Sequence, residues 1–248
     1  MTDTATPLND PPPPPPGDPE LGRWPWLPYV APMAAFLGLT WFEGFLPHTD
    51  PGSATIAYYP CVYAIKIAIV VLTLWLSRSA WRDLRPLPGA GSAALAIAIG
   101  FVVALVWVGA DGYYPTWGSI GARAAYDPTI LTPASRAAFL AVRFFGLVLV
   151  VPLFEELFWR SFVVRYIIDP DHFEAVPIGR VTWGAAALTA GMFALEHPAE
   201  WLPALGTGFA WAWLLHWSRS VSTCVLSHAV ANLALGVYVM RTGDWKFW

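Results

Sequence analysis

The sequence predicts an all-α, polytopic integral membrane protein with about seven to eight transmembrane helices. Of its 248 residues, 56% are hydrophobic and only 12% are charged, whereas charged residues make up about 25% of soluble domains. Fifteen tryptophans and nine tyrosines suit the aromatic belts at the two membrane surfaces. The net charge of −3 comes without a run of basic residues, which argues against a nucleic-acid partner.

The chain begins with a polar segment, residues 1–25, that contains the proline run Pro11–Pro16. It lacks the basic start and the apolar core of a signal peptide. Because polyproline is extended and solvated, we expect a disordered cytoplasmic tail. We interpret this tail as a linker rather than a recognition motif.

Seven later segments are apolar and approach the roughly 20 residues that a spanning helix needs. They are Trp26–Leu46, Ile56–Leu76, Ser92–Ala110, Phe144–Ile168, Val181–Leu195, Pro203–Trp217 and Val221–Met240. Ala134–Arg143 is a candidate for a separate interfacial helix, which would be the eighth. The chain then divides into N-terminal helices with a cap loop (26–143, with the loop at Asp111–Pro133), a core (144–240) and a C-terminal tail (241–248).

Basic residues in the short loops predict the orientation. The loop after the second span holds Arg78, Arg82 and Arg85, whereas Pro47–Ala57 holds no lysine or arginine. This places the N-terminus in the cytoplasm. Two further arginines agree with the assignment and two oppose it: Arg180 and Arg219 fall on the cytoplasmic side, and Arg123 and Arg136 fall outside.

The first group of ionisable residues inside an apolar run is Glu155, Glu156 and Arg160. A charge near the bilayer centre costs roughly 2.5–3.5 kcal/mol on insertion scales, so such residues usually serve a function. Glu156 and Arg160 are four apart and can pair on one helix face. Glu155 points about 100° away and is the candidate general base. The alternative is a buried ion network that joins two helices.

Two further groups follow. His197 ends the fifth apolar run, directly before Pro198, and a histidine there equally suits capping of helix carbonyls. His228 and Asn232 are four apart on one helix face. Both can donate hydrogen bonds to a developing oxyanion, or they can bond to each other in a helix contact. Together, a carboxylate, two imidazoles and an amide suffice to hydrolyse an amide with an activated water.

Other polar residues have simpler interpretations. Glu43 and Lys66 lie in the first two spans and are expected to form a structural pair across them. Arg143 is expected to extend to the membrane interface. Cys61 and Cys224 form neither a disulfide framework nor a zinc spacing, and we expect them to be packing residues.

The order EExxxR, FxxxH, HxxxN resembles the CAAX-protease and bacteriocin-processing family, also called type II CAAX prenyl endopeptidases or ABI proteins. The resemblance spans about Phe144 to Met240. The wider text EELFWRSFVVRYIIDP, FALEH and SHAVANLALGVYVMRTGDWKFW is similar to the CAAX prenyl protease-related proteins of bacteria with exosortase systems.

This resemblance implies a role for each motif residue. Glu155 would activate water and His197 would help to hold it. Glu156 would orient the site through Arg160, and His228 with Asn232 would form the oxyanion site. Members of this family are often described as metalloproteases, but the same constellation works without a metal, and we favour a site without cofactor or metal. If zinc is present, its ligands would be Glu155, His197 and His228, although the HExxH spacing is absent.

The function expected from the resemblance is intramembrane hydrolysis of a peptide bond in a membrane-anchored protein or peptide. The protein would then be a multi-pass protein of the bacterial inner membrane, with the lipid bilayer and exosortase-system components as partners. The alternative is a non-catalytic membrane immunity or assembly factor that retains the protease fold. A transporter with a carboxylate proton relay is disfavoured because the polar groups concentrate in the C-terminal half.

Overall fold

The computed structural model describes residues 24–43, 45, 58–116 and 126–247. Within these ranges the regular structure is helical, without strands, which confirms the all-α prediction. Residues 1–23 of the tail predicted for 1–25, and Arg123, lie outside the described residues.

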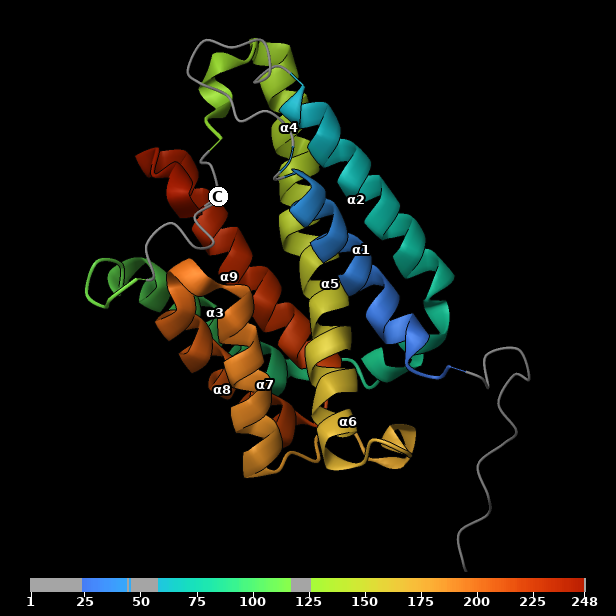
Figure 1. The fold of residues 1–248 in the computed structure, drawn as a ribbon. Coiled ribbons are helices and arrows are strands. Elements are labelled where there is room, and N and C mark those ends of the chain that lie inside the picture. Colours follow the sequence, from blue (N-terminus) through green and yellow to red (C-terminus); the bar gives the residue numbers. More distant parts are fainter. Residues whose placement is uncertain (1–23, 44, 46–57, 117–125, 248) are drawn as a thin grey trace, which may run out of the picture.

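In the part of the chain that the structure describes, the long helices are six separate ones and one composite helix (Figure 1). The separate ones are α1 (Leu27–Glu43), α2 (Tyr59–Leu76), α3 (Ala90–Gly109), α7 (Trp183–Glu196), α8 (Trp201–Ser218) and α9 (Val221–Thr242). The composite helix runs from Pro133 to Ile168 and contains α4 (Pro133–Phe145), α5 (Val151–Glu156) and α6 (Val164–Ile168). Figure 1 shows it in the middle, with α1 and α2 on one side and α3, α7, α8 and α9 on the other.

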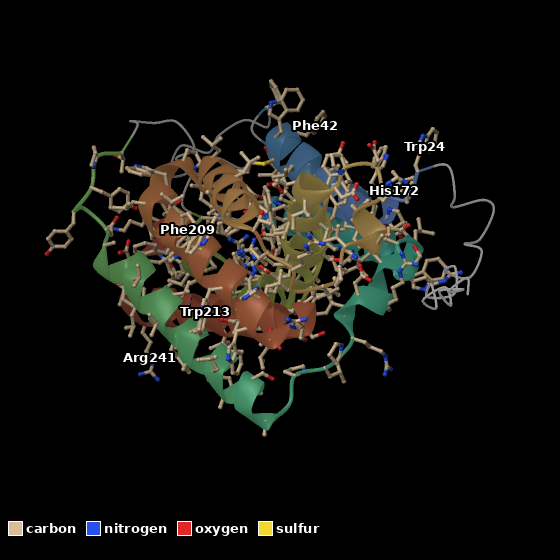
Figure 2. The ribbon with its side chains drawn as sticks, turned by 90° about the horizontal axis from the view of Figure 1, so that it is seen from below. Trp24, Phe42, His172, Phe209, Trp213 and Arg241 are labelled. Atoms are coloured by element: carbon tan, nitrogen blue, oxygen red, sulfur yellow. The ribbon has the colours of Figure 1, made fainter. Side chains whose placement is uncertain are left out.

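Four helices of the described residues are long and apolar enough to cross a membrane: Tyr59–Leu76, Ala90–Gly109, Pro133–Ile168 and Val221–Thr242. The protein is therefore a membrane protein with a helical membrane domain. The count of about seven to eight spans and the cytoplasmic N-terminus stay predictions. Large apolar side chains project outward as expected for a lipid-facing surface; Figure 2 shows Phe42 and Trp24 at the periphery, and both are exposed.

The prediction of a separate interfacial helix at Ala134–Arg143 is wrong, because this segment continues into the following span. The helix begins where the Thr132 side chain accepts a hydrogen bond from the Ser135 amide, with Pro133 in the first turn. No cap or break follows Arg143. The change at Gly146 is a widening of the helix rather than its end.

Two π-helical segments interrupt the composite helix, at Gly146–Val150 and Leu157–Val163. Pro152 explains the first, because proline lacks an N–H and its ring crowds the carbonyl four residues earlier, at Val148. Wider turns of this kind inside α-helices often mark functional sites. The two segments flank α5, which carries Glu155 and Glu156.

Close helix contacts depend on small residues. A Cβ atom on Gly100 of α3 would lie 2.5 Å from the Ser227 carbonyl oxygen of α9. A Cβ on Gly208 of α8 would lie 2.7 Å from the Ala190 Cα of α7. Glycine at these positions lets the helix backbones approach closely, as in many membrane bundles.

Two predictions about polar residues before the predicted core have opposite outcomes. The pair between Glu43 and Lys66 is confirmed, with 2.7 Å between Oε2 and Nζ. The prediction that Arg143 extends to the interface is wrong: it is 8% exposed, and its guanidinium carbon lies 4.6 Å from the centre of the Tyr63 ring. This aromatic contact with α2 replaces water as its environment.

Candidate active site

The glutamates of the first motif are the last two residues of α5, and both are inside the bundle. Glu156 and Arg160 are 0% exposed, and 3.2 Å separate Glu156 Oε2 from Arg160 Nε. The predicted ion pair is therefore confirmed. Glu155 is 4% exposed and also interacts with its surroundings.

The first and third motifs meet at Glu156. Its Oε1 lies 3.0 Å from Nδ1 of His228 on α9. A carboxylate paired with arginine accepts hydrogen bonds, so this geometry assigns the hydrogen to Nδ1. The Nε2 atom of His228 is thereby left for another partner.

An indole contacts the face of the His228 ring. Trp211 of α8 stacks on it, with 4.4 Å between ring centres. The Trp211 N–H donates to Ser227 Oγ at 3.1 Å, which fixes the indole to the helix that carries His228. The imidazole is thus oriented by a hydrogen bond and by an aromatic contact.

Aromatic faces also surround Arg160. Its guanidinium carbon lies 5.5 Å from the centre of Phe193 and 5.4 Å from that of Trp211. Among the described residues, no acceptor makes a hydrogen bond with its Nη1 or Nη2. A fully buried guanidinium with five donors and one carboxylate contact retains the capacity to bind a further acceptor.

The histidine of the second motif lies directly after α7. His197 Nδ1 is 3.0 Å from the Phe193 carbonyl oxygen, which can only accept, so Nδ1 carries the hydrogen here as well. The His197 ring contacts Phe193 and Trp107, with ring centres 4.6 Å and 5.4 Å away. Because Phe193 also contacts Trp211 at 5.9 Å, an aromatic chain connects His197 to the ring stacked on His228.

Asn232 lies one turn after His228 on α9 but has a different partner. Its side-chain N–H donates to the Leu147 carbonyl oxygen at 2.8 Å, inside the first π-helical segment. His228 and Asn232 thus both bond to the composite helix. Their predicted joint role at an oxyanion is untested by this geometry.

The segment after α3 covers the turn that follows His197. Tyr114 donates to the Ala199 carbonyl at 3.3 Å, and the Trp201 N–H donates to the Pro115 carbonyl at 2.9 Å. Burial, followed by the carboxylates of Glu200 and Asp111, raises the pKa of Tyr114. Residues 111–116 of the predicted cap loop therefore lie against the His197 end of α7.

The three predicted zinc ligands are not assembled into a metal site in the described residues. Among the residues that the structure describes, no group of three or more histidine, cysteine, aspartate or glutamate side chains is placed to hold a metal ion. Glu155, His197 and His228 do not converge as three ligands of one ion.

Sequence reasoning missed three residues that shape this site: Phe193, Trp211 and Trp107. Phe193 stands in the FxxxH motif, four before His197, and this spacing could have identified it. Trp211 lies in an apolar run with several other aromatics and Trp107 in one whose other aromatic is Phe101, and no sequence pattern distinguishes either tryptophan.

Part of the chain matches a known family. Residues 137–234 match the model of the family described as type II CAAX prenyl endopeptidase, Rce1-like. This range begins in α4, ends in α9 and includes all six candidate residues. No curated protein and no solved structure matches the chain.

Proposed function

We propose, from the premise that residues 137–234 are a domain of the Rce1-like type II CAAX prenyl endopeptidase family, that the protein is an intramembrane endopeptidase. Its substrate would be a membrane-anchored protein or peptide. The observation that carries the proposal is the 3.0 Å contact between Glu156 and His228, which joins the first and third motifs in a buried site.

In the proposed reaction, Glu155 accepts a proton from a water molecule while the water oxygen attacks the peptide carbonyl carbon. His197 helps to hold this water through Nε2, since its Nδ1 is bonded to Phe193. The carbonyl oxygen becomes an oxyanion. Protonated Glu155 then returns its proton to the leaving amine, the C–N bond breaks, and the carboxylate is regenerated.

The oxyanion would be stabilised by His228 and Asn232. Because Nδ1 of His228 donates to Glu156, its Nε2 donates to an oxyanion only when the ring is an imidazolium. The Glu156 carboxylate would compensate this charge, and Arg160 would hold the carboxylate in place. Asn232 uses one N–H for Leu147 and has a second for the substrate.

The proposed setting is the bacterial inner membrane, with the N-terminus in the cytoplasm. There, components of an exosortase system are the proposed partners, on the basis of the sequence resemblance around Glu155 and His228. The proposed chemistry does not require a prenyl group, because the reacting groups act only on the peptide bond.

The decisive experiment compares wild type with Glu155→Gln in proteoliposomes, using a panel of membrane-anchored peptides with and without a lipid-modified cysteine. We expect Glu155→Gln to lower kcat about 10²–10⁴-fold, the usual contribution of a general base. Glu43→Gln is the matched control, because Glu43 is a carboxylate paired with Lys66 outside the matched domain. Equal function of Glu155→Gln and wild type would contradict the proposal and support the non-catalytic alternative.

The proposed metal-free chemistry has its own test. Dialysis against a strong zinc chelator is expected to leave the cleavage rate unchanged, since the proposed steps use only side chains and water. Loss of cleavage that added zinc restores would contradict this part of the proposal.

A further inference from the structure

The connection between α2 and α3 carries a buried polar cluster centred on Asp83, outside the matched family domain. Asp83 belongs to a short 3-10 helix, η2 (Arg78–Leu84). Its Oδ2 accepts hydrogen bonds from Tyr29 at 2.6 Å and from Ser161 at 2.7 Å, and it forms an ion pair with Arg165. The Asp83 side chain is only 12% exposed.

Two of these partners belong to the composite helix. Ser161 lies in the π-helical segment Leu157–Val163, directly after Arg160 and five residues after Glu156. Arg165 follows in α6, where it also bonds to Ser161 Oγ at 2.8 Å. Asp83 therefore fixes the segment through which the backbone passes from Glu156 to Arg160 and beyond.

The same connection also holds the start of α9. Ser222 Oγ donates to the Leu84 carbonyl, and Ser220 Oγ donates to the Pro86 carbonyl at 2.6 Å. Ser222 lies six residues before His228 on the same helix. Residues 83–86 are thus bonded on one side to the helix of Glu156 and on the other to the helix of His228.

We infer that Asp83 is a positioning residue for the Glu156–His228 contact. The inference rests on the proposed function for its catalytic consequence. A hydrogen bond of 3.0 Å between two helices depends on their relative placement. Asp83 sets that placement by anchoring Ser161 and Arg165 to a connection that also anchors Ser220 and Ser222. The carboxylate touches no reacting group.

The test uses the full-length protein and the variant Asp83→Asn, which keeps the shape of the side chain but removes its charge. Glu174→Gln is the matched control: it removes the exposed pair with Arg82, the neighbour of Asp83, and contacts neither α5 nor α9 through that pair. The first readout is the His228 Nδ1–H resonance in protein labelled with nitrogen-15 histidine. The five histidines are distinguished with a His228→Gln sample.

We expect Asp83→Asn to move this resonance upfield as the bond to Glu156 lengthens, while Glu174→Gln leaves it in place. For cleavage, we expect Asp83→Asn to lower kcat about tenfold with KM within about twofold, since small misplacements of catalytic groups are costly. A purely structural role would instead reduce the folded fraction without changing kcat per folded molecule. The swap Asp83→Arg with Arg165→Asp is expected to recover part of the loss.

An unchanged His228 resonance in Asp83→Asn overturns the inference, as does a moved resonance with unchanged kcat. Should Asp83→Asn fail to fold, Ser161→Ala removes the bonds of Ser161 Oγ to Asp83 and Arg165 but leaves the Asp83–Arg165 pair in place, and its smaller shift in the same direction decides the question. The resonance does not require any cleavage. Absence of peptidase activity would therefore count against the proposed function, while the resonance still tests the positioning role.

Discussion

Two buried polar clusters, centred on Glu156 and on Asp83, differ in how fully their hydrogen bonds are made. One carboxylate oxygen of Asp83 accepts hydrogen bonds from Tyr29, Ser161 and Arg165. Around Glu156, the partners are Arg160 and His228, and the Nη1 and Nη2 atoms of Arg160 make no hydrogen bond within the described residues. Both clusters include residues of the composite helix: Glu156 and Arg160 in one, and Ser161 and Arg165 in the other.

This difference distinguishes a structural cluster from a reactive one. A carboxylate oxygen that already accepts from three donors, as Asp83 Oδ2 does, has little to gain from a substrate, because a new contact would displace an existing one. A cluster whose charged groups are already fixed, and whose N–H donors are not all hydrogen-bonded, can bind a developing negative charge without reorganisation. The same chemical groups thus serve architecture at Asp83 and, in our proposal, catalysis at Glu156.

The largest effect is expected from Arg160→Met. It leaves the buried Glu156 carboxylate without its guanidinium, and breaking a buried pair in this way typically costs about 3–5 kcal/mol. The measurement is the free energy of unfolding in mixed micelles. We also expect cleavage to be lost.

The control for this variant is the double substitution Arg160→Met with Glu156→Leu. Removing both charges is often neutral for stability, so the double variant should regain most of the lost stability but no cleavage. If Arg160→Met alone is as stable as wild type, the contrast between the two clusters is mistaken.

The second-largest effect is expected from Trp211→Phe. It keeps an aromatic ring beside His228 but removes the donor to Ser227 and part of the stacking area. We expect this loss to lower the free energy of unfolding by about 1–2 kcal/mol. We expect kcat to fall several-fold because the His228 ring is less constrained. Trp213→Phe, on the same helix but 53% exposed, is the control and should change neither quantity. Equal effects at both positions would argue against a role for the Trp211 stack.

Tyr29→Phe tests the other cluster. It deletes one of three donors to Asp83 and should lower the free energy of unfolding by about 1 kcal/mol. Ser161 and Arg165 still hold the carboxylate, so kcat should stay within about twofold of wild type. Tyr166→Phe, an exposed tyrosine of α6, is the matched control. A large loss of kcat in Tyr29→Phe would erase the distinction between the clusters.

Local spacing predicted some of this arrangement. The pair of Glu156 with Arg160 follows from four-residue spacing on one helix, and the pair of Glu43 with Lys66 follows from two charges in consecutive spans. The contacts of Asp83 with Ser161 and Arg165 join residues 78 and 82 positions apart, which no local pattern encodes. The roles of the six motif residues stay predictions.

The π-helical segments were missed for a related reason. Pro152 indicates a disturbed turn, but whether the helix breaks, kinks or widens depends on what satisfies the released carbonyls. Here Asn232, on a helix 85 positions later in the chain, bonds to Leu147. The prediction for Arg143 is wrong for the same kind of reason, because its burial depends on Tyr63 of another helix.

The smallest effect is expected at the C-terminus, where Lys246 bonds to Asp111 beyond the end of α3 and thereby links that end to the segment after α9. The hydrogen bond to Asp111 raises the pKa of Lys246 above its ordinary value. The stabilisation is therefore present at neutral pH and is lost as the pH rises through the raised pKa. Because both side chains are exposed and screened, Lys246→Ala should lower the free energy of unfolding by about 0.5 kcal/mol or less.

Unfolding of wild type and Lys246→Ala, measured from neutral to strongly alkaline pH, should show this difference shrinking to zero, and salt should reduce it at neutral pH. A difference that persists at alkaline pH would mean that Lys246 stabilises the protein by packing rather than by charge.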